Sequence, residues 1–276
     1  MKLLRTVIVG SCLVLFLSLN AEAGRKRISD EDLSNVFTEA DIEKEIEFGR
    51  NMAAQLLADY ELVDDLALIR YVNLVGNVVL QNASRQEIKY YFGVIKSKEI
   101  NAYATPGGYI FITTAAFNLM QSEAGLAAVL AHEIAHVVER HIVKVLKLKA
   151  EDDSVTRVLG QLTAGSSATA ETMFNQAMGK AFDILFSKGL KIEDEFGADK
   201  LGLLMSAMAG YDAMSYFDYL ERIQPLVSSG DQQVLKTHPP IENRISSLKA
   251  SYKDEGLFSM GGNRGINRLM KYKTVE

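Results

Sequence analysis

The segment His-Glu-Ile-Ala-His at residues 132–136 has the residue types and the spacing of a hydrolytic metal site. On an α-helix, residues four apart lie on one face, so His132 and His136 can bind one ion together. Glu133 is displaced by about 100° around the helix axis and therefore stands beside the ion. There its carboxylate can take a proton from a metal-bound water. The segment predicts zinc-dependent hydrolysis with Glu133 as the general base.

A catalytic zinc ion takes three protein ligands, and an acidic segment downstream supplies the best third one. Glu195 and Asp199 are four residues apart, at the start of an apolar stretch that predicts a second buried helix. Glu195 could bind the ion, while Asp199 could accept a hydrogen bond from a ligand histidine and fix its tautomer. The alternative is a solvated acidic helix face. Because the segment follows a histidine pair, ligation is the preferred interpretation.

Three motifs follow one another along the chain: His-Glu-x-x-His at 132–136, Glu-x-x-Ala-Asp-x-x-Gly at 195–202, and His238-Pro239 followed by Arg244. This order resembles peptidase family M48, the gluzincin metallopeptidases that include HtpX-like, CAAX-prenyl-protease-like and periplasmic quality-control enzymes. Segments 101–108 and 139–141 agree, so the resemblance covers about residues 40–250. It implies that His132, His136 and Glu195 bind one zinc ion per chain and that Glu133 is catalytic. Gly125 departs from the family pattern, which bears on helix stability rather than on chemistry.

The elements that must position these residues are mostly helical. The apolar run around the histidine pair predicts a buried helix, with Ser122 as its N-cap. Runs rich in Tyr, Phe, Val and Ile, with a turn at 105–108, predict a small antiparallel sheet. We therefore predict an α+β, mainly α, zincin-like fold in which the His-Glu-x-x-His helix packs on this sheet. The expected segments are helices within 40–82, 174–186, 193–210, 208–223 and 241–252, strands within 89–96, 100–104 and 109–113, and a loop at 160–172.

The strand ahead of the zinc helix is the expected substrate-binding element. A peptidase can hold an extended peptide by letting it add a strand to a sheet edge. Asn101, Ala102, Tyr103 and Ala104 suit this role, because the small alanines leave space and Asn101 could hydrogen-bond the peptide. The resemblance implies the same role. The alternative is an ordinary hairpin strand.

The late histidine, His238, has three competing roles. It could donate a hydrogen bond to the oxyanion of the reaction, it could occupy the open zinc position as a latch, or it could be a structural loop residue. Proline on its C-terminal side favours an extended, rigid backbone there. Arg244 is expected to pair with a carboxylate and to orient this loop. His141 is expected to be structural, because it lies five residues beyond His136 and off the ligand face.

The helix expected over Phe174–Phe186 carries large apolar side chains every four residues. Such a face is expected to cover the core, and the alternatives are a mobile lid or a membrane-facing element.

The N-terminus resembles a secretory signal. Lys2 and Arg5 precede an apolar run at 6–19 and an Ala-x-Ala cleavage site at 21–23. The prediction is a signal peptide at 1–23, a metallopeptidase domain at 24–255, a tail at 256–276 and export to the periplasm. The alternatives are a membrane anchor formed by an uncleaved N-terminal segment, or a lipoprotein at Cys12.

Composition narrows the function classes further. The formal net charge is −5, and no basic stripe with interleaved aromatics occurs, so nucleic acid is not an expected partner. Cys12 is the only cysteine, which excludes intrachain disulfides and a cysteine-ligated structural zinc.

We predict a zinc metalloendopeptidase that acts on protein or peptide substrates. The family resemblance implies protein quality control, with misfolded envelope or outer-membrane proteins as the expected substrates. Peripheral association with a membrane or with outer-membrane proteins is compatible with this, and the oligomeric state is open. The competing class is a chaperone-like protein-binding module with a closed structural zinc site. A third possibility is a helical protein whose motifs are coincidental, which predicts no stoichiometric zinc.

Overall fold

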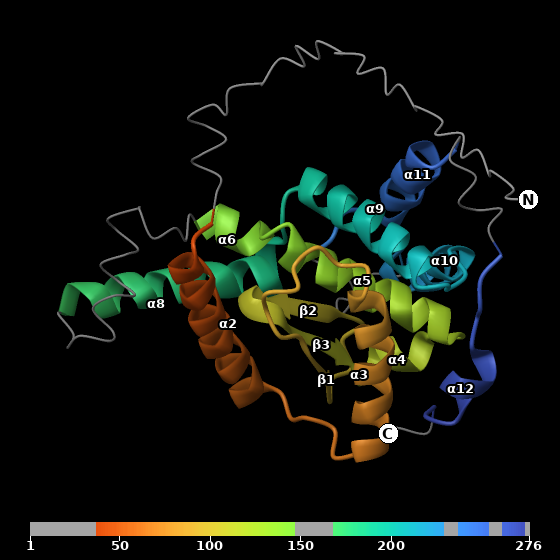
Figure 1. Cartoon of the computed structure of the whole chain (residues 1–276), viewed down its shortest axis with the longest axis horizontal. Helices are drawn as coiled ribbons and strands as arrows, with labels where there is room; N and C mark the ends of the chain where they lie inside the picture. Colours follow the sequence, from red (N-terminus) through yellow and green to blue (C-terminus); the bar gives the residue numbers. More distant parts are fainter. Residues whose placement is uncertain (1–36, 147–167, 229–236, 254–260, 274–276) are drawn as a thin grey trace, which may run out of the picture. The chain divides into compact units, whose positions relative to one another are not determined.

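The computed structural model describes residues 37–146, 168–228, 237–253 and 261–273 (Figure 1). The predicted signal peptide, Cys12, residues 25–36 and residues 160–167 of the expected loop lie outside the described residues. Within the described part of the chain, no helix combines the length and the apolar character needed to cross a membrane.

Two helices open the domain, α2 (Glu39–Asp59) and α3 (Leu66–Leu80), which confirms the helical pattern predicted for residues 40–82. Each begins at a side-chain cap. Thr38 and Asp41 form a reciprocal capping box on α2, and the Asp65 carboxylate accepts hydrogen bonds from the first turn of α3. The two caps fix where each helix starts. A short connection joins the end of α2 to the start of α3.

The sheet has three strands, β1 (Tyr91–Ile95), β2 (Ala102–Thr105) and β3 (Tyr109–Thr113), in the order β1-β3-β2. Strands β2 and β3 form the expected antiparallel hairpin around the 3₁₀ turn η1 (Pro106–Gly108). The expectation of a wholly antiparallel sheet is wrong for β1, which pairs with β3 in parallel. The connection after β1 leads to the opposite edge of the sheet, where β2 lies. The hairpin then places β3 between β1 and β2. This order leaves β2 at the sheet edge.

Helix α5 (Glu123–Val138) carries the histidine pair and is buried along almost its whole length. The predicted N-cap is confirmed, because the Ser122 hydroxyl accepts a hydrogen bond from the Gly125 N–H at 3.0 Å. Helix α9 (Ile192–Met208) contacts α5, and the sheet contacts α5 as well (Figure 1). Gly202 permits the close approach of the two helices, since a Cβ there would lie 2.7 Å from the His132 backbone nitrogen.

The remaining helices surround this centre: α4 (Thr114–Leu119), α6 (His141–Leu146), α8 (Ala168–Asp183) with the π-turn η2 (Ile184–Lys188), α10 (Met214–Ser228) and α11 (Ile241–Ser251). The loop expected at 160–172 is wrong for residues 168–172, which already belong to α8. Helix α10 begins later than predicted, because Met208 still belongs to α9 and Gly210 reverses the chain at a φ of 85°.

The amphipathic helix predicted around Phe174–Phe186 is confirmed as α8 and η2. Met178 is buried in an apolar cluster with Phe48 of α2 and Ile142 of α6. The Phe174 ring also meets the Phe48 ring edge-on at 5.9 Å between centroids. In this structure the apolar face of α8 therefore covers part of the core.

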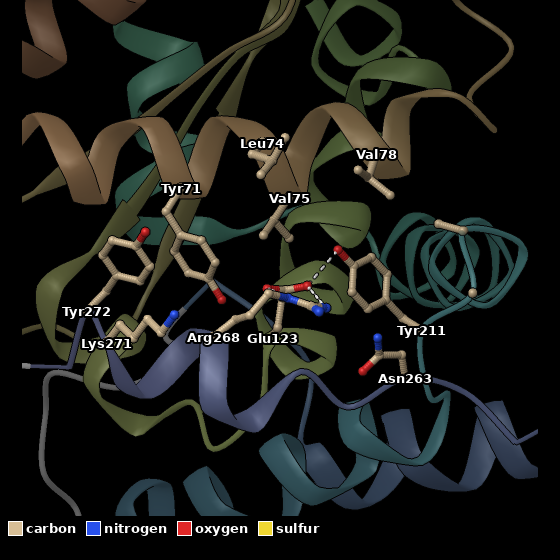
Figure 2. Close-up of a pocket in the computed structure, with 12 residues that line it drawn as sticks. Tyr71, Leu74, Val75, Val78, Glu123, Tyr211, Asn263, Arg268, Lys271 and Tyr272 are labelled. Atoms are coloured by element: carbon tan, nitrogen blue, oxygen red, sulfur yellow. Dashed lines mark hydrogen bonds and ion pairs between the residues drawn. The ribbon is translucent and has the colours of Figure 1, made fainter.

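Residues 256–276 were expected to form a tail, but residues 261–273 pack against the domain and include helix α12 (Ile266–Met270). Leu269 is fully buried, and Arg268 donates hydrogen bonds to both Glu123 oxygens at 2.8 and 2.5 Å. Figure 2 shows Arg268 and the Tyr211 hydroxyl converging on Glu123 at the start of α5. A hollow of about 460 Å³ remains between α3 and α12. Arg264 also pairs with Asp218 of α10, and the Tyr272 ring stacks on Tyr71 of α3. The segment is therefore held by contacts with separate elements, which give no periodic sequence pattern.

Candidate metal centre

His132 and His136 of α5 and Glu195 of α9 converge on one point, and all three are buried. The two Nε2 atoms lie 3.0 Å apart, and each is 3.7 Å from a different Glu195 oxygen. Donors around a tetrahedral zinc ion are separated by roughly 3.3 Å, because each lies about 2 Å from the metal. The geometry therefore brings together the three residues that the sequence predicted as ligands.

The rear of His132 is held by an anionic network. Its Nδ1 lies 2.9 Å from Asp199 Oδ1, and Asp199 also receives two hydrogen bonds from Arg244, at 2.9 and 2.6 Å. The Tyr216 hydroxyl of α10 donates to the same carboxylate at 2.7 Å and accepts a hydrogen bond from Arg244 at 2.7 Å. Asp199 is thus placed to accept the hydrogen bond expected from a ligand histidine, and the carboxylate that pairs with Arg244 is that of Asp199.

The rear of His136 has a different partner. Its Nδ1 lies 2.8 Å from Nδ1 of His141, which is buried at the start of α6. The expectation that His141 lies away from the ligands is wrong. Helix α5 ends at Val138, and Arg140 adopts a left-handed backbone conformation with φ of 54°, so the helical spacing no longer applies to His141.

The facing atoms fit a cation. If each ligand histidine donates its Nδ1 proton to the partner behind it, both Nε2 atoms present lone pairs to the same point. The Glu195 carboxylate adds two more acceptor oxygens there. Three buried acceptor groups facing one another repel unless a positive charge lies between them. The described residues therefore fit a divalent metal ion.

The pKa shifts of His136 and Glu195 are consistent with this, whereas Asp199 raises the pKa of His132 against the effect of its burial. Burial lowers the pKa of His136 well below its usual value, which favours the neutral imidazole that binds metals. Burial alone would raise the pKa of Glu195, but the neighbouring His238 and His136 outweigh it and lower the pKa below the ordinary range. Burial likewise opposes ionisation of Asp199, and the Arg244 guanidinium reverses this and lowers its pKa.

Glu133 lies beside the ligands with its carboxylate uncommitted. Its side chain is 4% exposed and makes no hydrogen bond or ion pair with any residue in the described part of the chain. Burial raises the pKa of the Glu133 carboxyl above its usual value, although the nearby His132 and His238 oppose this. A buried, unpaired carboxylate of raised pKa is suited to accept a proton.

Comparison with known proteins agrees with this geometry. The model of "Peptidase family M48" matches residues 68–252. The chain belongs to peptidase family M48. It is 29% identical over 219 residues to the "Beta-barrel assembly-enhancing protease" of Escherichia coli strain K12, which covers 75% of this chain and 44% of that protein. It is 28% identical over 187 residues to the "Mitochondrial metalloendopeptidase OMA1" of Schizosaccharomyces pombe, covering 65% and 51%. The chain thus spans less than half the length of the bacterial relative.

The M48 site opens onto a narrow cleft bordered by β2. Ala102, Tyr103 and Ala104 line one hollow together with Glu133 and Glu195. Asn101 lines a second hollow with Glu133 and His238, and its side-chain oxygen accepts a hydrogen bond from the Ala102 N–H at 2.9 Å. The Tyr103 ring packs against Phe186 at 4.8 Å and its hydroxyl bonds Glu99, so this side chain belongs to the core rather than to free cleft surface.

His238 lies across this M48 cleft. Its Nδ1 is 2.5 Å from Glu195 Oε2, and its ring borders both hollows. The preceding Thr237 packs closely on Gly189, where a Cβ would lie 2.1 Å from the Thr237 carbonyl oxygen. Each hollow measures about 30 Å³, so in this arrangement the cleft is closed.

Sequence reasoning missed two residues of the site, Tyr216 and His141. Tyr216 is one of three tyrosines within the predicted 208–223 helix, and nothing in its local sequence marks it. His141 had a signal, because it is one of only four histidines in the chain and follows the His-Glu-x-x-His segment closely.

Proposed function

We propose that this chain is a zinc-dependent metalloendopeptidase. The observation that carries the proposal is the convergence of two imidazoles and a carboxylate on one point, next to the uncommitted Glu133 carboxylate. Two nitrogen ligands and one oxygen ligand form the donor set of many catalytic zinc sites, which leave one position open. The relatives named as a protease and as a metalloendopeptidase support the same class.

Each residue of the centre has a defined task in this proposal. His132, His136 and Glu195 hold the zinc ion, which when bound polarises the scissile carbonyl and lowers the pKa of the attacking water. Glu133 accepts the proton of that water on its carboxylate and passes it to the leaving amine nitrogen. Burial raises the pKa of the Glu133 carboxyl, which favours transfer of a proton to it.

The substrate in this proposal is an extended polypeptide that pairs with the free edge of β2. Main-chain hydrogen bonds to Asn101–Ala104 hold the peptide, and the small side chains of Ala102 and Ala104 leave room beside the ligands. We further propose a periplasmic location and envelope or outer-membrane protein substrates. The name of the bacterial relative, which refers to β-barrel assembly, supports this choice.

His238 acts as a latch in the resting enzyme. Its contact with Glu195 and the two small hollows on either side of its ring support a latch that closes the cleft through the ligand carboxylate, whereas the latch expected from the sequence occupies the open zinc position. While Nδ1 bonds Glu195, this nitrogen is not free to donate to a substrate carbonyl. The segment at 237–240 must therefore move before a peptide can reach Glu133.

The same contact supports a second candidate function. If His238 permanently closes the site, the zinc is structural and the chain holds unfolded clients at its sheet edge without cutting them. A closed structural site, however, has no use for an uncommitted carboxylate beside the metal. Glu133 therefore separates the two functions.

The test is the Glu133→Gln variant, which keeps the size of the side chain and removes its ability to accept a proton. We expect it to bind one equivalent of zinc, as the wild type does, and to lose casein hydrolysis. A drop of at least about 100-fold is typical of the loss of a general base. Wild-type protein that binds zinc but cleaves neither casein nor unfolded envelope proteins would favour the binding module, and protein that binds no zinc would exclude both.

A further inference from the structure

We propose that His141 is a positioning residue for the metal ligand His136. The inference rests on the proposed function, because it concerns how this chain prepares His136 for the ion. Its foundation is the 2.8 Å contact between the two Nδ1 atoms. Both rings are buried, with His136 7% and His141 5% exposed, so water does not compete for this contact.

The tautomers of the histidines follow from the geometry. Nε2 of His136 faces Nε2 of His132 and the Glu195 carboxylate, so this nitrogen must be unprotonated to bind a metal. The single proton of the neutral ring then lies on Nδ1, which donates to Nδ1 of His141. His141 must accept this bond, and its own proton therefore lies on Nε2. That nitrogen points toward Asp194 of α9, whose carboxylate is 3.8 Å away.

The backbone conformation just before His141 places its ring against the ligand His136. Arg140 is the only described non-glycine residue with a positive φ, and this left-handed turn reverses the chain directly after α5. An arginine in this conformation is strained, because its Cβ approaches the following carbonyl oxygen. Glu45 of α2 offsets this strain by accepting a 3.2 Å hydrogen bond from Arg140 Nε. The Arg140 guanidinium also lies 3.8 Å from the centre of the Phe37 ring.

The two ligand histidines are thus oriented by different chemistry. His132 donates to the Asp199 carboxylate, which carries a full negative charge, whereas His136 donates to a neutral imidazole. Both contacts fix a ring and its tautomer, which is how partners behind metal-binding histidines raise affinity. Helix α9 serves both, since it supplies Asp199 directly and places Asp194 behind His141.

The test compares three variants of His141 in the full chain. His141→Asn places its side-chain oxygen near the position of Nδ1 and can still accept from His136. His141→Gln carries its oxygen further out, near the position of Nε2. His141→Leu fills the space with no acceptor. The zinc dissociation constant of each is measured by competition with a chromophoric chelator, and the cobalt(II) form supplies an absorption spectrum that reports ligand geometry.

We expect zinc affinity to fall about 10- to 100-fold in the Leu and Gln variants, the usual effect of losing such a partner, and to stay within about threefold in the Asn variant. The cobalt spectrum should change in the first two and not in the third. Thermal unfolding of the metal-free proteins serves as the folding control. Should the Leu variant bind zinc as tightly as the wild type, His141 does not position the ligand.

The design separates this inference from the proposed function. Wild-type protein without stoichiometric zinc binding would remove the metal site itself, before His141 is considered. Stoichiometric zinc with equal affinity in all three variants would remove only the role of His141. A large loss in all three, with unfolding temperatures unchanged, would also contradict it, because the acceptor at the Nδ1 position would then not be what matters.

Discussion

The Arg244 guanidinium donates two hydrogen bonds to the Asp199 carboxylate, at 2.9 and 2.6 Å, and both side chains are almost completely buried. Arg244 comes from α11 and Asp199 from α9, so this pair fastens two helices and at the same time holds the acceptor of His132. Removal of one partner from a buried ion pair leaves the other charge unpaired.

Arg244→Leu should destabilise the metal-free protein by about 3–5 kcal/mol, the cost of leaving a buried carboxylate without its cation. Urea unfolding in the presence of a chelator measures this. The matched control is Lys96→Ala, because the Lys96–Glu61 pair is exposed on both sides and its loss should cost about 0–1 kcal/mol. Equal effects of the two substitutions would contradict the structural role of Arg244.

Gly202→Ala should weaken both folding and zinc binding. Its Cβ would lie 2.7 Å from the His132 nitrogen, so α9 must move away from α5 and carry Glu195 with it. Overpacking of this kind costs about 1–3 kcal/mol. Gly197 lies in the same helix, and a Cβ there meets nothing within 4 Å, so Gly197→Ala should be neutral or stabilising by up to about 1 kcal/mol. Calorimetry and zinc titration of the two variants make the comparison.

Arg268→Ala should destabilise the protein by about 1–3 kcal/mol, because the buried Glu123 carboxylate would lose its cation while keeping the 3.2 Å hydrogen bond from the Tyr211 hydroxyl (Figure 2). Arg264 belongs to the same segment but pairs with Asp218 at the surface, where both side chains are at least 40% exposed. Arg264→Ala should therefore cost about 0–1 kcal/mol. If chemical denaturation finds the two variants alike, Glu123 does not depend on α12.

Zinc should raise the unfolding temperature of the wild-type protein, because the ion binds the folded state and relieves the repulsion between the facing acceptors. At a free zinc concentration 1,000 times the dissociation constant, the stabilisation is about 4 kcal/mol. His136→Ala should abolish most of this shift while the metal-free protein still folds. A zinc-independent melting curve for the wild type would argue against the site.

His238→Ala should increase casein turnover several-fold, because the contact with Glu195 that closes the cleft is lost. A drop of about 100-fold in kcat would instead identify His238 as an oxyanion donor. No change would leave it as a structural loop residue. Zinc content is measured in parallel, so that a loss of metal is not mistaken for a loss of activity.

Local periodicity accounts for what could be predicted. The i, i+4 spacings put His132 with His136 and Glu195 with Asp199, and each pair needs only its own helix to share a face. The apolar runs around them marked both helices as buried, and the Ser122 cap located the start of α5. The β2–β3 hairpin was equally local, since its turn and both strands lie within one short segment.

Contacts between separate elements could not be predicted from local periodicity. The parallel pairing of β1, the anchoring of α12 through Leu269 and the approach of Tyr216 to Asp199 each join separate elements of the fold. No period in the sequence encodes which face of one element meets another. The α12 segment shows the limit most clearly, because its partners lie on the separate helices α3, α5 and α10, whereas its own sequence resembles a tail.

The sequence by itself determined the side chains of the candidate metal centre: the two histidines and the glutamate proposed as ligands, the carboxylate beside them and the helices that carry them. Only the tertiary structure decided how the ligand histidines are held from behind. Asp199 reached His132 as expected, but His141 reached His136 through a single left-handed residue, Arg140, which ends the helical period. Helical spacing is set by local hydrogen bonds, whereas a chain reversal depends on partners such as Glu45 that lie far away in sequence.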